Sequence, residues 1–533
     1  MNKYKKLTFI LIIVLAFALR FYKLGQIPTS LDWDENSNAY NAYSILKTGR
    51  DEYGNFLPLT NRSFDDYKPP LYMYLNVMTI PIFGLTPFAS RLPSAFLGTA
   101  TVILAYYLAK FLFRNQKIIN VELASQISML LLATSPWHAH FSRVGFEANV
   151  GLFCAVSAIT TFLYGLKKRK LLPLSALLFA ISAYSYHSVR IYLPLLFLAT
   201  IYVYRNEIKT LSKKIILSFL IIASIFTLPV LVFTPRDAIT ERFNAATSEL
   251  RREEAEKAIK YIKQDQKEHI PFASIIDNRR LFTFSTILDN YLWHFDLNYL
   301  FIKGDDNFRH HIEGQGMLYL WQLPFILMGI FQLIKNRSRE TTLILLWLLI
   351  APIAAAPARP APHAIRSEAM VIPFILITAF TICQLVAKKG MIAKMLLAST
   401  ILAASFSFIV YLHDYFIHYP LEQSAPWQYG YNTAAEETDK LKTHYEKIKV
   451  DGALEQAYIF WLFSTKFDPS VYQKNGSRNG FDKYVFNSPA PTSPSELYVS
   501  TAGKFPENFI ILKTINYPNG EAAIKIGYPQ TNK

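Results

Sequence analysis

The chain of 533 residues has few charged residues, only two cysteines and no tract of low complexity. Charged residues make up 18% of it and hydrophobic residues 52%, whereas a soluble globular chain carries about a quarter charged residues. Cys154 and Cys383 both lie within apolar runs, which excludes a disulfide framework. The composition therefore predicts a membrane protein, with most of its apolar residues in spanning segments.

The formal net charge of +16 comes mostly from lysine and arginine in short loops between apolar runs. This distribution is typical of the cytoplasmic loops of membrane proteins and differs from a continuous basic face. Nucleic acid is therefore not an expected partner. Aromatic residues make up 15% of the chain, which suits belts of rings at two membrane–water interfaces.

The first two apolar runs decide the expected topology. Leu7–Phe21 follows three lysines and has no small-residue cleavage site after it, which predicts an uncleaved anchor with a cytoplasmic N-terminus. Leu71–Leu85 is about fifteen residues long, short of the roughly twenty that span a bilayer. If this run lies at the interface, every basic loop falls in the cytoplasm, so we expect an interfacial helix there.

The sequence predicts a mainly α-helical polytopic fold with about eleven transmembrane helices. The odd number places the C-terminus outside the cytoplasm, together with a large outer loop at 235–315. From residue 413 charged and turn residues increase, which predicts a small soluble α/β domain at 413–533 after a membrane domain at 1–412. The expected spans are 7–21, 92–113, 121–135, 148–166, 171–187, 191–206, 215–234, 316–335, 341–357, 368–387 and 391–412.

The polar first outer loop, 31–71, is the main candidate for a functional site, because ionisable residues at a membrane boundary are functional candidates. Asp34 directly precedes an expected surface helix, Glu35–Thr48, and Lys68 stands where the loop returns to the interface. Asp32 with Glu35 three residues later also fits a capping box, so helix capping stays open beside catalysis. Lys68 could equally be an interfacial lysine that extends its ammonium toward water.

Further cationic and acidic side chains recur in the short outer turns, at Arg143, Glu147, His187, Arg190, His363 and Arg366. Cations that converge around carboxylates at one membrane face would suit an anionic, membrane-borne ligand. Each lone arginine could instead face lipid headgroups, and Glu147 could be an ordinary solvated helix end.

Metal binding is left open by the sequence, and no cofactor is required. Histidine pairs in the outer turns match no strong spacing for metal ligands, at His138, His140, His310 and His311. Three carboxylates of the first outer loop could bind a divalent cation through their oxygens, at Asp34, Asp65 and Asp66.

These residue types fit the transfer of a sugar from a lipid phosphate. Asp34 or Glu35 could take the proton from an incoming hydroxyl or amine. Cations would bind the phosphate leaving group, whose charge grows as the bond breaks; the candidates are Lys68, Arg143, Arg190, His363 and Arg366. The alternative, a transporter of a lipid-linked or anionic substrate, would place ionisable residues near the bilayer midplane, where this chain has few.

Several short motifs occur together and in order: Asp34-Glu35, Lys68-Pro69-Pro70-Leu71, Phe83-Gly84, Arg91-Leu92-Pro93-Ser94-Ala95, and Ser135-Pro136-Trp137 with Ser142-Arg143. In combination they resemble the GT-C class of membrane glycosyltransferases. Within that class they resemble the bacterial protein O-mannosyltransferase-like and aminoarabinose-transferase-like enzymes of the glycosyltransferase 39/83 group. The resemblance covers residues 1–415.

The resemblance implies an inverting transfer from a polyprenyl-phosphate sugar, on the outer face of the cytoplasmic membrane. It implies that Asp34, paired with Glu35, is the catalytic carboxylate and that Lys68 contacts the donor phosphate. Supporting positions are expected at Asp66, Tyr67, Arg91, Glu147 and His187. The sugar stays open between a hexose and a pentose, and the acceptor among protein, lipid and cell-envelope glycan.

Overall fold

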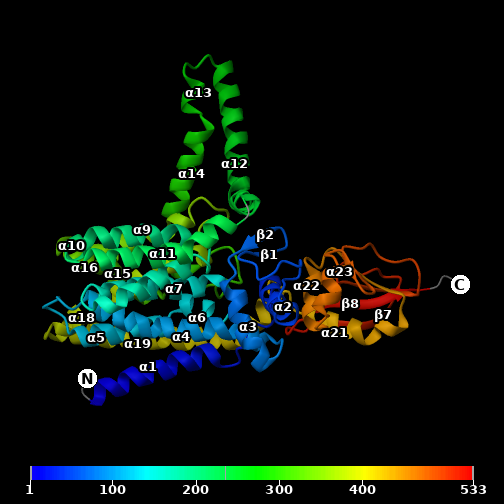
Figure 1. Ribbon diagram of the computed structural model, residues 1–533, viewed down its shortest axis with the longest axis horizontal. Helices are drawn as coiled ribbons and strands as arrows, with labels where there is room; N and C mark the ends of the chain where they lie inside the picture. Colours follow the sequence, from blue (N-terminus) through cyan, green and yellow to red (C-terminus); the bar gives the residue numbers. More distant parts are fainter. Residues whose placement is uncertain (1–2, 235, 531–533) are drawn as a thin grey trace.

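The computed structural model describes residues 3–234 and 236–530, and the fold is mainly helical. Long helices lie side by side in a bundle, and a smaller unit that contains a sheet sits at one end of it (Figure 1). The bundle helices are α1 (Lys3–Phe21), α4 (Pro87–Leu112), α5 (Val121–Thr134), α7 (Glu147–Gly165), α8 (Leu172–Ser182), α9 (Val189–Val203), α11 (Lys213–Phe233), α15 (Leu323–Lys335), α16 (Arg339–Ile350), α18 (Val371–Ala387) and α19 (Met391–His413). Each predicted span therefore contains a helix.

Not every one of these helices is long enough to cross a membrane by itself. Five of the described helices are both long and apolar enough: Pro87–Leu112, Glu147–Gly165, Lys213–Val230, Ala364–Ala387 and Met391–Glu422. The predicted number of eleven spans is thus not confirmed. In the third and fifth of these helices only 6% of the apolar window is buried inside the protein. Such apolar faces are unfavourable in water and suit lipid, so the chain is an integral membrane protein.

The first outer loop folds into a compact layer on one end of the bundle. Its helix α2 (Trp33–Thr48) starts at a capping box, in which Asp32 Oδ1 accepts the Glu35 N–H and Glu35 Oε2 accepts the Asp32 N–H. The capping interpretation of this pair is therefore confirmed. Its second helix, α3 (Leu71–Phe83), has 13 residues, about 20 Å in length, and is too short for a bilayer core of about 30 Å.

A helical hairpin projects away from the side of the bundle (Figure 1). Its arms are α12 (Arg236–Lys267) and α14 (Arg279–Trp293), with the short α13 (Ala273–Ile276) between them. It occupies most of the predicted large outer loop. The chain then returns to the bundle end through a π-helical turn at Asn298–Ile302. Short helices in other connections are α6 (Pro136–Phe141), α10 (Arg205–Lys209), α17 (Ala364–Ser367) and α20 (Tyr419–Glu422).

The C-terminal unit is built on a six-stranded mixed sheet, in the strand order β4-β5-β3-β6-β8-β7. The strands are β3 (Lys447–Val450), β4 (Gly480–Phe481), β5 (Tyr484–Val485), β6 (Glu496–Thr501), β7 (Phe509–Asn516) and β8 (Ala522–Pro529). The two long strands β7 and β8 pair in antiparallel fashion, while β3 runs parallel to β6. The helices are α21 (Tyr431–Leu441), α22 (Ala457–Ser464) and α23 (Pro469–Asn475).

This unit shares a hydrophobic core with the first outer loop. Tyr40 and Ile45 of α2 belong to the same buried cluster as Tyr458 and Trp461 of α22. The backbone of α2 is therefore held from two sides, by the bundle and by the C-terminal unit, which limits its freedom to move.

The orientation in the membrane can be tested with single cysteines in a Cys154→Ala, Cys383→Ala background. We expect cysteines at Asn55 and Asn519 to react with an impermeant thiol reagent added to intact cells. A cysteine at Lys168 should react only after the cells are permeabilised. All three positions are exposed in the folded protein, so labelling measures access across the membrane rather than burial. Labelling of Lys168 in intact cells would overturn the predicted orientation.

Candidate active site

A cavity of 450 Å³ opens where the first outer loop meets the outer turns of the bundle and the C-terminal unit. Carboxylates and cations from distant parts of the chain face it together. The charged and histidine residues that line it are Asp32, Asp34, Asp65, Asp66, Lys68, Glu147, His187, Arg309, His310, His363 and Arg366. The cavity thus has the mixed charge that the sequence predicts for this membrane face.

Asp34 and Lys68 form an ion pair at this cavity, in which the ammonium donates a hydrogen bond to Asp34 Oδ1. Lys68 Nζ also lies 3.9 Å from Glu147 Oε1. The Asp34 side chain keeps 30% of its surface exposed and that of Lys68 11%, so the carboxylate is the more accessible partner. Burial lowers the pKa of Lys68, but Asp34 and Glu147 outweigh it and the pKa ends above its usual value. The lysine is therefore charged at neutral pH.

A small β-hairpin positions Lys68. Its strands β1 (Asn61–Ser63) and β2 (Asp66–Lys68) pair so that Asn61 lies opposite Lys68. The Asn61 side-chain amide donates to Asn38 Oδ1 at 3.1 Å, and the Asn38 amide donates to Glu147 Oε1 at 2.9 Å. This chain of hydrogen bonds connects the hairpin to α2 and to the first turn of α7.

Glu35 is fully buried and is not part of the cavity lining. Arg91 of α4 contacts both of its oxygens, with Nε 2.8 Å from Oε1 and Nη2 3.0 Å from Oε2. The Gly145 N–H donates to Oε1 at 2.7 Å. Gly145 permits this approach, because a Cβ there would lie 3.0 Å from Glu35 Cγ. Glu35, which the sequence groups with the catalytic residues, is thus a positioning residue in this geometry.

Asp32 and Arg309 form a second pair at the cavity, which the sequence did not identify. Arg309 Nη1 lies 3.0 Å from Asp32 Oδ2, and the guanidinium lies 5.5 Å from the centre of the Trp33 ring. Burial raises the pKa of Asp32 to about 7, and the nearby Asp34 adds to this. Its neighbours His310 and His311 are conspicuous in the sequence as a histidine pair, and they were the only sign that a site residue lies at this position.

Other predicted site residues also line the cavity or contact its walls. His363, Arg366 and Asp66 are in the lining. His187 lies in the lining too, and its Nε2 donates to the Tyr67 carbonyl at 2.9 Å. Tyr67 thus contributes through its backbone.

Two arginines that the sequence assigns to the donor phosphate are not part of the cavity lining. Arg143 is buried and donates to the carbonyls of Leu19, Tyr22 and Ile27, at 2.7, 2.7 and 3.0 Å. Arg190 donates from Nε to the Ala183 carbonyl at 2.7 Å. Both guanidinium groups donate to backbone carbonyls, so the structure does not bring them to the proposed phosphate.

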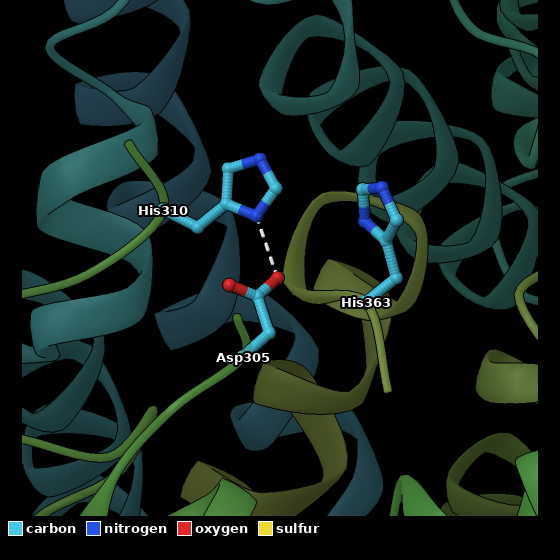
Figure 2. Close-up of side chains that lie close together, drawn as sticks. All are labelled: Asp305, His310 and His363. Atoms are coloured by element: carbon cyan, nitrogen blue, oxygen red, sulfur yellow. Dashed lines mark hydrogen bonds and ion pairs between the residues drawn. The ribbon is translucent and has the colours of Figure 1, made fainter. Parts of the chain in front are cut away.

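The groups that could hold a metal differ from those suggested by sequence. Asp65, one of the carboxylates suggested as a metal ligand, forms an ion pair with Arg478 of the C-terminal unit, with 2.6 Å between Asp65 Oδ1 and Arg478 Nη1. Within residues 3–234 and 236–530 the first-loop carboxylates form no metal-ligating group. A group of mixed ligands does converge at the cavity wall, formed by the buried Asp305 and His310 and the half-buried His363 (Figure 2).

The buried pair of Glu35 and Arg91 yields a stability prediction. Glu35→Gln keeps the shape of the side chain but leaves the Arg91 guanidinium buried without its counter-charge. Breaking a buried pair in this way costs about 3–5 kcal/mol. We expect a clearly lower thermal unfolding temperature of the purified protein, whereas the matched control Glu436→Gln, at an exposed position of α21, should leave it unchanged. Equal unfolding temperatures for both variants would contradict a structural role for Glu35.

Comparison with known proteins agrees with this architecture. Residues 67–233 match the family model of dolichyl-phosphate-mannose-protein mannosyltransferases. No curated protein matches the chain in sequence.

Solved structures share the fold, among them an archaeal oligosaccharyltransferase and a bacterial ArnT. The oligosaccharyltransferase AglB from Archaeoglobus fulgidus, in complex with an inhibitory peptide and a dolichol-phosphate, is 12% identical with a TM-score of 0.52. That match covers 87% of this chain and 64% of AglB, so the chain spans less than two thirds of that enzyme. ArnT from Cupriavidus metallidurans, bound to undecaprenyl phosphate, is 11% identical with a TM-score of 0.51, and 97% of each chain is covered.

At these identities the structural likeness shows a common fold, and the family match adds a relation in sequence over part of the bundle. Both findings agree with the class that the sequence motifs predict. The match over residues 67–233 and the fold common to AglB and ArnT together support a membrane glycosyltransferase of the GT-C class.

Proposed function

We propose that the protein transfers a hexose or pentose from a polyprenyl-phosphate carrier to an acceptor, with inversion at the anomeric carbon. The observation that carries this proposal is the pairing of Asp34 with Lys68 at one cavity beside the bundle end. The solved structures with this fold also support it, because AglB was solved with a dolichol-phosphate and ArnT with undecaprenyl phosphate.

The proposed site lies on the outer face of the cytoplasmic membrane, with the N-terminus in the cytoplasm. Residues 1–412 form the transferase domain, and residues 413–533 cover the site from the outside. The lipid tail of the donor stays in the bilayer, its phosphate lies at the interface and its sugar enters the cavity.

Cations around the cavity bind the phosphate. Lys68 carries a fixed charge there, and Arg366 lines the same space. As the bond between the anomeric carbon and the phosphate oxygen breaks, that oxygen takes the electron pair and its negative charge grows. Cations that are already in place stabilise this charge more in the transition state than in the bound donor.

Asp34 is the general base. It lies in the first turn of α2, where the helix dipole favours a negative charge. In the resting site Lys68 holds it by a hydrogen bond. When a phosphate enters, the ammonium turns toward the phosphate and frees Oδ1. The acceptor oxygen or nitrogen then attacks the anomeric carbon from the face opposite the phosphate, and its proton passes to Asp34.

Asp34→Asn tests this role, because asparagine keeps the size of the side chain and is tolerated at a helix start. We expect the variant to fold and to bind donor, but to lose a factor of about 10²–10⁴ in turnover, the usual contribution of a positioned base. Turnover is measured as release of free polyprenyl phosphate. The matched control is Asp289→Asn on the exposed face of α14, which should keep normal turnover. Near-normal turnover of Asp34→Asn would refute the assignment.

Lys68→Ala should weaken donor binding at least about tenfold, which is about 1.4 kcal/mol, and should slow turnover as well. Lys68→Arg is expected to recover only part, because a planar guanidinium cannot reproduce a compact ammonium. Binding is measured by titration with a polyprenyl phosphate, and Lys504→Ala, at an exposed lysine, is the control. An unchanged affinity in Lys68→Ala would remove Lys68 from the phosphate site.

A further inference from the structure

We propose that Asp305, His310 and His363 bind a divalent transition-metal ion, with Zn²⁺ as the reference case, in the wall of the site cavity. Figure 2 shows the three side chains gathered from two separate loops, one that follows the π-helical turn and one that precedes α17. One ligand atom from each residue lies within 4.8 Å of the other two. Two imidazole nitrogens and one carboxylate oxygen are a donor set that Zn²⁺ and related metals prefer.

The two loops are fixed in place by hydrogen bonds around the cluster. Asp305 Oδ2 accepts the Ala364 N–H at 2.8 Å, which links one loop directly to the other. The Asp305 carbonyl accepts a hydrogen bond from His311 Nε2 at 2.7 Å. The His363 N–H donates to His294 Nε2 at 3.2 Å. Such outer contacts orient ligands before the ion arrives, as they do in known metal sites.

The cluster is close to the geometry that an ion would need. His310 Nδ1 lies 2.6 Å from Asp305 Oδ2, a contact that a proton bridges when no ion is bound. Asp305 and His310 are buried, with 7% and 3% exposure. In a tetrahedral zinc site neighbouring ligand atoms lie about 3.3 Å apart. Rotation of the half-buried His363 ring closes the set, and a small separation of the His310 ring from the Asp305 carboxylate opens their 2.6 Å contact to this distance.

The charge of the cavity also bears on a cation. Its lining contains five carboxylates and three lysine or arginine side chains, but Asp65 is paired with Arg478 and the pKa of Asp32 is raised to about 7, so the remaining charges nearly balance. Asp305 adds a further carboxylate directly behind this wall, and an anionic phosphate would give the cavity a negative excess. A divalent ion between Asp305 and the two histidines would offset it where charge is least screened by water.

The position of the ligands indicates where an open coordination site would face. His310 and His363 line the site cavity, whereas Asp305 lines a neighbouring cavity of 700 Å³. The ion therefore lies in the wall with its open side toward the site cavity, where a phosphate oxygen of the donor would coordinate it. This last step rests on the proposed function, whereas binding of the ion does not.

Zinc binding is tested on the full-length purified protein, after treatment with a chelator, by calorimetric titration with Zn²⁺ alone. His413, Asp414 and His418 form a second, more exposed group of candidate ligands. The background variant therefore carries His413→Ala and His418→Ala. We expect one bound Zn²⁺ per chain in this background. Adding His363→Ala should weaken binding at least tenfold, and adding the exposed control His444→Ala should not.

Co²⁺ absorption tests whether His363 is a direct ligand. In the background variant, Co²⁺ should give the intense visible bands of a tetrahedral site. His363→Cys should keep metal binding and add a thiolate-to-cobalt absorption band that the background lacks. Zn²⁺ should also raise the unfolding temperature of the background and of His363→Cys, but not of His363→Ala.

Two results would overturn the proposal. One is the absence of zinc binding in the background variant. The other is equal zinc affinity in the background and in His363→Ala. Neither readout uses sugar transfer, so failure of the metal site and failure of the proposed function are distinguishable. If the protein binds Zn²⁺ at this site but does not transfer sugar, the metal site stands. Only the coordination of a donor phosphate by the ion then loses its support.

Discussion

The buried ion pair between Glu35 and Arg91 holds the site together. It joins the start of α2 to α4, and the Gly145 N–H adds the turn before α7 to the same carboxylate. A charge buried in this way is unfavourable unless it is fully paired, so these segments can pack in few other arrangements. The adjacent Asp34 then emerges at the cavity, within reach of Lys68. The capping box fixes the same turn from its other side.

The site is thus assembled from parts of the chain that are far apart in sequence. The first outer loop supplies Asp34 and Lys68, and the outer turns of the bundle supply Glu147 and His363. Arg309 arrives from beyond the helical hairpin and pairs with Asp32. The shared core of α2 and α22 closes the arrangement from the outside. A site of this kind suits catalysis by preorganised charge, because its charged groups are in place once the donor is bound.

The positions of the long helices could be predicted from the sequence, because a long apolar run can be recognised from its own residues alone. Sequence reasoning also identified the residues where charge at the membrane boundary is unusual, such as Lys68 and Arg366. It placed the catalytic role on Asp34 only through the family resemblance, because the residues alone do not separate Asp34 from Glu35: adjacent carboxylates differ only in the direction that each takes from the helix. For the same reason it assigned Arg143 to the phosphate, although that guanidinium is used by backbone carbonyls. The contact of Arg309 with Asp32 spans 277 residues, a distance over which periodicity carries no information.

The central claim is that this protein breaks the bond between a sugar and a polyprenyl phosphate. The most direct measurement is to incubate the purified wild-type protein with a panel of radiolabelled polyprenyl-phosphate hexoses and pentoses and crude membrane acceptors, and to quantify free polyprenyl phosphate. The account predicts that one donor releases lipid phosphate in step with transfer of its label to an acceptor. Recovery of every donor intact, or movement of intact donor across proteoliposome membranes, would contradict it.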